Sequence, residues 1–536
     1  MKNIFVIGAL LAIAVSSAQA QDGAPPPENM WLGEFIVGGK ATGIILHDRS
    51  ATPGAPSAID VPSMNARSLP LAKFTMTASH GSFELQGGPE LLKFDGALTK
   101  GKGSFTGKVM QGAQQGKITL VQAQANNMAD NFRAAGSYQI APGHVIDIGP
   151  MDEMGGMLIF IDQKTLREGP LFALSSTKFV SGPSIGVPYP FVIGAEFVKD
   201  AKGVVTGMRW RDGKKEVMAK KITPHRVEGV SIAHGDITLK GALTLPLKPG
   251  PHPAIVMAHG SGDAKRNVGI WISFFVRQGF AVLSLDKRGV GASTGDWHKA
   301  SMDDLAGDWL AGVDMLKQRA DIDVKRIGVH GSSQGGWTAP LMAARSNDIS
   351  FVIVRAGSAV KVSDTMAHEI AWSTREGGMS EGDAKEAEAA ALQLFALASG
   401  EWKAYDAFAS TLKGKPWARY VWPLNYSEKG WGKPWAAMNA HYDPAETLAK
   451  VKVPMLWFLA DMDHNVPSAA SAQALIAART ASGNKDITVV QLAGGHSFVQ
   501  SKTGNSDDFV HATKMTTGYF DKMESWLKAG VLKNSK

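Results

Sequence analysis

Two different patterns of hydrophobic and polar positions divide the chain. From Trp31 to about Ala125, apolar and polar residues alternate in short runs such as residues 73–77, and glycine-rich turn signals separate the runs. A second stretch of the same kind extends from about residue 132 to 222. Alternation between turn signals is typical of antiparallel strands with one buried face. The sequence therefore predicts two β modules without a shared sequence repeat, over residues 21–125 and 126–224.

At about His225 the pattern changes. Strand-like segments are now apolar throughout, and segments with helical character alternate with them. Uniformly apolar strands are typical of a mostly parallel sheet that helices cover on both faces. We expect one such domain over residues 225–536. The predicted strands are 254–259, 281–286, 326–331, 351–356, 455–460 and 487–492, and the predicted helices between them include 269–278, 303–318 and 335–345.

Between about residues 361 and 449 the alternation of strands and helices stops. Helix-like sequence takes over there, including residues 382–398. We interpret this segment as a helical lid inserted between two strands of the sheet.

The first twenty residues have the pattern of a secretory signal. Lys2 precedes an apolar run from Ile4 to Val15, and Ala18-Gln19-Ala20 stands before a polar stretch. This predicts cleavage after Ala20 and a periplasmic or secreted protein. The apolar run is too short to span a bilayer, and no later stretch is long and apolar enough to do so.

Composition narrows the chemistry further. The chain of 536 residues contains no cysteine, which excludes disulfides, a thiolate metal site and a thiol nucleophile. The formal net charge of +7 becomes +6 when Lys2 leaves with the signal. Its basic residues are scattered along the chain, which argues against nucleic-acid binding. We expect no metal and no cofactor.

A nucleophile motif, G-x-S-x-G, is centred on Ser333 in Gly331-Ser332-Ser333-Gln334-Gly335. The motif places a serine on a tight turn from a strand to a helix, where small residues must flank it. The same pattern surrounds Ser184 and Ser293, but only Ser333 has a predicted strand directly before it and an apolar helix directly after. Ser333 is therefore the predicted nucleophile.

A serine hydroxyl needs a base, and the base needs an orienting acid. His496 follows the last predicted strand in Gly494-Gly495-His496. His464 and His511 are the alternatives. The acid is predicted to be Asp463, three residues before Val466-Pro467, with Asp461 as the alternative. The order Ser, Asp, His is that of α/β hydrolases.

The negative charge that develops on the substrate oxygen needs backbone N–H donors. One predicted donor is Gln334, the residue after the nucleophile. The second is predicted from the loop His259-Gly260-Ser261-Gly262, with Ser261 preferred and Gly262 as the alternative.

These motifs resemble those of secreted bacterial α/β-hydrolase-fold serine esterases and, more distantly, of prolyl oligopeptidase-type and serine aminopeptidase-type hydrolases. The resemblance extends from His225 to Lys536 and includes the run Asp286-Lys287-Arg288-Gly289, for which we expect ion pairs that shape the loop beside the site. It implies an α/β-hydrolase fold with an inserted helical lid behind an N-terminal antiparallel β-rich region. It also implies hydrolysis through an acyl-enzyme.

The preferred substrate class is a small-molecule carboxylic ester. Related exopeptidases use carboxylates to anchor a free amine, and no Glu-Glu pair stands near the lid, which disfavours the alternative of an exported peptidase. A thioesterase or acyltransferase would use the same triad. The lid holds six of the 14 tryptophans, and we expect Trp417, Trp422 and Trp431 to bind an apolar or aromatic group of the substrate. The β modules are expected to pack against the catalytic domain, with glycan or protein binding as the alternative.

Overall fold

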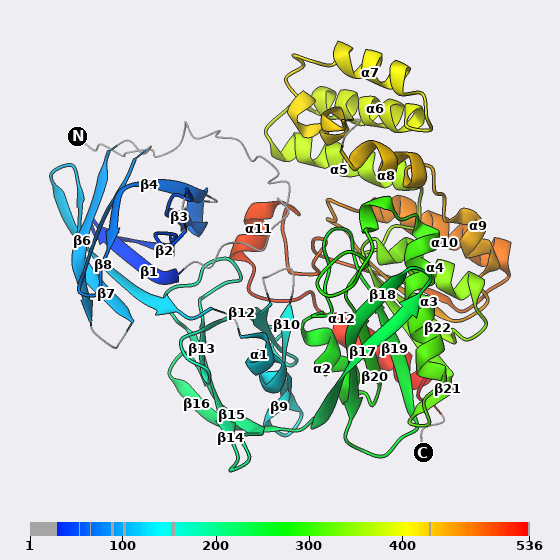
Figure 1. The fold of residues 1–536 in the computed structure, drawn as a ribbon, viewed down its shortest axis with the longest axis horizontal. Helices are drawn as coiled ribbons and strands as arrows, with labels where there is room; N and C mark the ends of the chain where they lie inside the picture. The colour runs from blue at the N-terminus through cyan, green and yellow to red at the C-terminus, as the bar shows by residue number, and fades with distance from the viewer. Residues whose placement is uncertain are drawn as a thin grey trace.

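Three structural units follow one another along the computed structural model, and Figure 1 shows them as two β-barrels beside a larger sheet with helices. The structure describes residues 29–533, except 53, 65, 87–89, 100–102, 126, 152–155 and 428–429. The predicted signal of residues 1–20 therefore lies outside the described residues. Within the described residues, no helix is long and apolar enough to cross a membrane.

The first β module is a closed antiparallel barrel of eight strands. Closure comes from pairing of the first strand with the last, from Met30 opposite Ala123 to Ile36 opposite Lys117. Alternate side chains point inward, and the rings of Phe83, Phe94 and Phe105 pack together inside. The strands are β1 (Asn29–Val37), β2 (Lys40–Asp48), β3 (Ala58–Val61), β4 (Ala66–Met76), β5 (His80–Leu85), β6 (Leu92–Thr99), β7 (Ser104–Gln111) and β8 (Gln114–Ala123), with a short 3₁₀ helix η1 (Pro62–Met64) after β3.

The second β module is also a closed eight-stranded barrel, preceded by α1 (Met128–Ala134). Its interior is filled by apolar side chains around Tyr138, Phe160 and Trp210. The strands are β9 (Gly136–Ala141), β10 (His144–Met151), β11 (Met157–Asp162), β12 (Glu168–Ala173), β13 (Lys178–Ser181), β14 (Ile193–Lys199), β15 (Val205–Asp212) and β16 (Lys215–Lys221). The predicted antiparallel region is thus two barrels of equal strand number.

An eight-stranded sheet begins at His225, in the order β17-β18-β20-β19-β21-β22-β23-β24. Ladders from β20 through β24 are parallel, whereas β17 and β18 add an antiparallel edge. The strands are β17 (His225–His234), β18 (Ile237–Pro246), β19 (His252–Ala258), β20 (Ala281–Leu285), β21 (Ile322–Ser332), β22 (Phe351–Arg355), β23 (Met455–Ala460) and β24 (Ile487–Leu492).

Helices cover both faces of this sheet. Side chains of α3 (Met302–Lys317), α4 (Gly335–Arg345) and α10 (Ser468–Ser482) share one apolar core with one face. Those of α2 (Ile270–Arg277) and α12 (Tyr519–Ala529) share another core with the opposite face. Because parallel strands end at the same edge, the loops after β19, β21, β23 and β24 are brought to one edge of the sheet.

The segment between β22 and β23 is helical, as predicted for a lid. It contains α5 (Val362–Glu376), α6 (Glu381–Leu397), α7 (Trp402–Thr411), η4 (Ala418–Tyr420), η5 (Trp422–Asn425), α8 (Gly432–Asn439) and α9 (Ala445–Lys450). In Figure 1, helices α5–α8 form a layer of their own above the sheet domain, while α9 lies beside α10.

Both barrels contact the rest of the chain. The second barrel packs on α2: Ser273 Oγ donates to the carbonyl of Ile148 over 2.6 Å, and Arg277 pairs with buried Asp147 at 3.1 Å. The first barrel packs on the second through Leu32 and Phe172. Its helix η1 also contacts α11 (Ser506–His511), which Figure 1 shows on the side of the first barrel.

Candidate active site

Ser333 occupies a strained turn between β21 and α4. Its φ of 51° lies in the left-handed region, which is unfavourable for a residue with a side chain. A Cβ at Gly331 would lie 2.3 Å from the carbonyl oxygen of Gly335, and one at Gly335 would lie 2.8 Å from that of Ala258. The two glycines of the motif are therefore required by close backbone approach, and the turn has the form of a nucleophile elbow.

The two rival serines have structural roles. Ser293 is buried, and its hydroxyl donates to the carbonyl of Asp286 and accepts from the N–H of Lys240. Ser184 lies in the second barrel and donates to the carbonyl of Val510 over 2.9 Å. Neither follows a strand that leads directly into a helix, so the geometry favours Ser333 among the three.

His496 and Asp463 lie together as the sequence predicts. Each carboxylate oxygen of Asp463 is 2.9 Å from His496 Nδ1. The Asp463 carboxylate is fully buried, and the backbone N–H groups of Asn465 and Val466 also donate to it over 2.9 Å. These bonds fix the carboxylate, and they leave Nε2 as the imidazole nitrogen that can accept a proton.

The alternative residues lie elsewhere. Asp461 accepts a 2.8 Å hydrogen bond from the N–H of Gly494, so it shapes the loop that carries His496. His464 packs with its ring centroid 6.1 Å from that of His496, and burial, followed by the proximity of His496, lowers its pKa. His511 is the last residue of α11 and lies outside the C-terminal helix α12.

Arg355 connects the loop of the nucleophile with the loop of the base. Its carbonyl accepts from the N–H of Ser333 at 3.0 Å, and its guanidinium donates to the carbonyl of Ser497 at 2.8 Å and to Ser332 Oγ at 3.2 Å. The backbone and the side chain of Arg355 therefore connect the turn that carries Ser333 with the loop that carries His496, at the same edge of the sheet.

The loop after β19 lies against the nucleophile. A Cβ at Gly260 would lie 3.3 Å from Ser333 Cβ, so the backbone of Gly260 approaches the serine closely. Ser261 is exposed, and Gly262 has a φ of 79° that favours glycine. Gln334 is the N-cap of α4, at the helix end where backbone N–H groups point outward. Both predicted segments for an oxyanion hole are thus next to Ser333.

A cleft of about 310 Å³ opens beside His496. Its walls come from the loop after β24, from α11 and the segment before it, and from the first barrel, which supplies Arg67. A second cleft lies between Asn505 and the lid residues Trp372, Arg375 and Glu376. Asn505 lines both clefts, which places the lid helix α5 next to the candidate site.

The three tryptophans predicted to bind substrate line neither cleft. Trp417 is 2% exposed, and its indole N–H donates to Glu386 within the lid. Trp422 packs against Phe395. Trp431 is exposed and packs against Trp297. Packing of the lid explains Trp417 and Trp422 without a ligand, and Trp372 is the lid tryptophan that faces a cleft.

Glu369 is a residue of the site that sequence reasoning missed. It projects from α5 close to His496, and its carboxylate is hydrogen-bonded to Asn465. Burial raises the pKa of this carboxyl, while the charge of His496 opposes the rise. Glu376, two helical turns further along α5, lies close enough to His464 for its charge to oppose the lowering of the His464 pKa. The two glutamates are not a Glu-Glu pair in sequence, but residues seven apart share one face of a helix.

Among the residues that the structure describes, no group of three or more His, Asp or Glu side chains is arranged to hold a metal ion. The site consists of a serine, an imidazole, carboxylates and backbone N–H groups. Such a set can perform nucleophilic acyl transfer.

Comparisons with known proteins support a hydrolase, as the arrangement of the site residues does. Residues 249–380, which include Ser333 but neither Asp463 nor His496, match the family described as serine aminopeptidase, S33. Esterase EstD of Thermotoga maritima is 30% identical over 173 residues, which cover 30% of this chain and 41% of that protein. The quorum-quenching protein AidA of Acinetobacter baumannii is 30% identical over 126 residues, covering 23% of this chain and 41% of that protein. The chain thus spans about two fifths of the length of these relatives.

Solved structures with similar folds are more distant. An esterase of Pyrococcus furiosus is 17% identical with a TM-score of 0.36, and the match covers 57% of this chain and 91% of that one. Est1E from Butyrivibrio proteoclasticus, solved with ferulic acid, is 18% identical with a TM-score of 0.34, covering 57% and 99%. The resemblance to α/β-hydrolase esterases rests on the family match and the curated relatives.

Proposed function

We propose that this protein is a serine hydrolase that cleaves carboxylic esters through an acyl-enzyme. The proposal is supported by two features at the same edge of the sheet: a serine on a strained turn between a strand and a helix, and a histidine hydrogen-bonded to a buried carboxylate. Ser333 is the nucleophile, His496 the base and Asp463 the residue that orients it.

The chemistry proceeds in two halves. His496 takes the hydroxyl proton as Ser333 Oγ attacks the acyl carbon, and backbone N–H groups of Gln334 and of the 260–262 loop stabilise the oxyanion. His496 then protonates the leaving alcohol. In the second half, His496 takes a proton from water as the water oxygen attacks the acyl carbon. The bond from the acyl carbon to Ser333 Oγ then breaks, His496 returns the proton to Oγ, and the acid is released. Asp463 stays ionised and stabilises the imidazolium in both halves.

Export belongs to the same proposal. Residues 1–20 have the pattern of a cleaved signal, and cleavage after Ala20 would place the enzyme in the periplasm or outside the cell. The proposed partner is a small-molecule ester whose apolar or aromatic group enters the clefts beside His496.

An aminopeptidase is the second candidate, and one observation favours it. The carboxylates of Glu369 and Glu376 lie on the side of α5 that faces His496 and His464, where they could bind a substrate's free amine. The match of residues 249–380 to serine aminopeptidases points the same way.

A single substrate screen distinguishes the candidates. The full-length protein and its Ser333→Ala variant would be compared on p-nitrophenyl acetate and butyrate and on aminoacyl p-nitroanilides. We expect turnover of the esters, weak or absent turnover of the anilides, and no turnover by the variant. Faster cleavage of the anilides would replace the ester proposal with the aminopeptidase. Equal activity of the variant would remove Ser333 from the mechanism.

A further inference from the structure

Lys287, two residues after the end of β20, is a buried lysine whose ammonium group lies beside the candidate site. The residue is 1% exposed. Its Nζ donates to the carbonyl of Gly260 at 2.6 Å, to that of Gly262 at 2.9 Å and to Gln334 Oε1 at 3.1 Å. An ammonium group has three N–H donors, so all three are used.

The three acceptors come from the two segments that flank Ser333. Gly260 and Gly262 belong to the loop after β19, and Gln334 directly follows the nucleophile. These are the segments proposed to supply the oxyanion donors. The ammonium group of Lys287 is therefore hydrogen-bonded to both segments of the proposed oxyanion hole.

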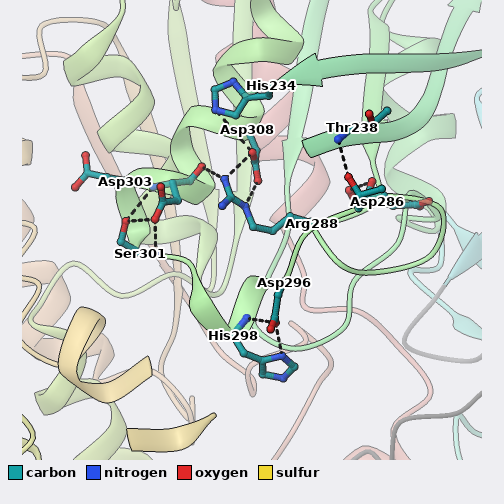
Figure 2. Close-up of polar contacts among 12 residues, drawn as sticks. His234, Thr238, Asp286, Arg288, Asp296, His298, Ser301, Asp303 and Asp308 are labelled. Atoms are coloured by element: carbon teal, nitrogen blue, oxygen red, sulfur yellow. Dashed lines mark hydrogen bonds and ion pairs between the residues drawn. The ribbon is translucent and has the colours of Figure 1, made fainter. Parts of the chain in front are cut away.

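Neighbouring ion pairs fix the backbone on both sides of Lys287. Asp286 accepts from the guanidinium of Arg266 and from the N–H of Ala292. Arg288 forms two hydrogen bonds with Asp308, at 2.7 and 2.8 Å, and Figure 2 shows its guanidinium between Asp308 and the start of α3. The expected ion pairs of this run are thus present on Asp286 and Arg288. Between these two residues, the buried side chain of Lys287 extends toward Gly260, Gly262 and Gln334.

This position is costly for a charged group. Burial lowers the pKa of Lys287 to about 7, with the charge of Asp263 opposing the shift. No carboxylate among the described residues forms an ion pair with Nζ, and the nearest aromatic face is that of Trp297, 5.1 Å away. A buried ammonium that binds only neutral oxygens gives little stability in return for its desolvation. Its three acceptors indicate another role.

We propose that Lys287 is a positioning residue that holds the 260–262 loop and Gln334 together, so that their backbone N–H groups converge on the substrate oxyanion. The inference rests on the proposed hydrolase function. Because Lys287 acts on the transition state through these N–H groups, its loss should lower kcat and leave KM nearly unchanged.

The test replaces Lys287 with methionine, which keeps all but the terminal atom of the side chain's length and removes the donors. The matched control is Lys221→Met in the second barrel, where Nζ donates to the carbonyl of Arg133 at 3.0 Å and burial lowers the pKa to about 8. For p-nitrophenyl butyrate we expect Lys287→Met to lose about 100-fold in kcat, comparable to the removal of one oxyanion donor, with KM within about twofold. Lys221→Met should keep both constants.

A second readout separates positioning from a general structural role. Phenylboronic acid forms a tetrahedral adduct with a nucleophilic serine, and its inhibition constant should weaken in Lys287→Met by about the same factor as kcat. If Lys287→Met does not fold, Gln334→Met removes one of the three acceptors and keeps the backbone N–H. That variant should also lose kcat, by a smaller factor.

The outcomes are distinct. If Lys287→Met keeps the wild-type kcat, the inference is overturned and the hydrolase proposal stays intact. If Lys287→Met does not fold, a wild-type kcat in Gln334→Met has the same meaning. An equal loss in Lys221→Met would show that buried lysines act through stability alone, and would overturn it too. If the wild-type protein cleaves no ester and Ser333 is not labelled by a fluorophosphonate, the hydrolase proposal fails and this inference fails with it.

Discussion

Ser333 has a backbone conformation that the chain stabilises with several contacts. A positive φ at a serine costs about 1–3 kcal/mol. The N–H of Ser333 donates to the carbonyl of Arg355 at 3.0 Å, and its own carbonyl accepts from Gly336 at 2.7 Å. These bonds offset the strain and keep the side chain at the edge of the sheet. Strain that is maintained in this way is typical of a functional position.

At the same scale, the two aspartates before Val466 have different tasks. Asp463→Asn should lower kcat by about three to four orders of magnitude, because the amide no longer holds His496 in the tautomer that can accept a proton. Asp461→Asn should cost less than about fivefold, the equivalent of one ordinary hydrogen bond, since the amide oxygen can still accept from Gly494. Steady-state kinetics on one ester measure both.

The two variants control for each other, because each removes one carboxylate from the same loop. A larger loss in Asp461→Asn would assign the orienting role to that residue instead.

Some residues of the site follow from sequence and others do not. Ser333, Asp463 and His496 stand in loops directly after apolar strands, with glycines or a Val-Pro pair at fixed spacing. Lys287 lay within a motif that sequence reasoning identified, but its acceptors belong to other loops. Glu369 carried no signal, because only the packing of α5 brings it to His496.

At the scale of elements, the lid helix α5 is the part of the insert that reaches the candidate site. Trp372 on α5 lines the cleft that shares Asn505 with the cleft beside His496. A Cβ at Gly504 would lie 2.9 Å from the Trp372 ring, so the loop after β24 packs directly on it. Helix α6 packs mainly on α5 and α7, whereas α8 contacts the 3₁₀ helix Trp297–Lys299 and α9 contacts α4 and α10.

Trp372 and Trp417 should therefore respond differently to truncation. Trp372→Ala should raise KM for p-nitrophenyl phenylacetate more than for p-nitrophenyl acetate, because the indole would bury apolar surface of the larger acyl group. Trp417→Ala should instead lower the free energy of unfolding, by about 3–5 kcal/mol, because its ring is enclosed in the lid. Kinetics on the two esters and thermal unfolding of both variants test this.

If Trp372→Ala changes KM for both esters by the same factor, the cleft at α5 does not select the acyl group. A selective change in Trp417→Ala would restore the substrate role first predicted for that residue.

The bounds of a helix or strand can be predicted where distinct residue types mark both of its ends. The helix α4 and the strands β23 and β24 have the residue ranges that the sequence predicted, because glycine, proline or polar residues bound uniformly apolar or periodic runs. The strands β17 and β18 were not identified. They form the antiparallel edge of the sheet. Exposed residues interrupt the apolar pattern in β17, whereas every residue of β18 is buried or half-buried.

At the scale of the whole molecule, the two barrels were predicted as β modules but not as barrels. Closure of the first depends on pairing of residues 30–36 with residues 117–123, which no local pattern encodes. The same holds for β9 and β16 of the second barrel. Alternation of apolar and polar residues marks a region as β, whereas the pairing that closes a barrel depends on contacts between residues far apart in the sequence.

The barrels also bear on the site itself. Arg67 of the first barrel lines the cleft beside His496. Glu168 of the second lies near Arg355, where burial raises the pKa of Glu168 to about 8 and the charge of Arg355 opposes the rise. The β modules therefore pack on the catalytic domain, and each brings one charged residue close to the candidate site: Arg67 to the cleft beside His496, and Glu168 to Arg355.

The central claim is that one serine, Ser333, is the nucleophile of the whole chain. Labelling of the purified full-length protein with a fluorophosphonate, followed by peptide mass spectrometry, tests it most directly. The account predicts one adduct, on the peptide that contains Ser333, and none in Ser333→Ala. An adduct on Ser184 or Ser293, or an unlabelled protein that still hydrolyses esters, would contradict it.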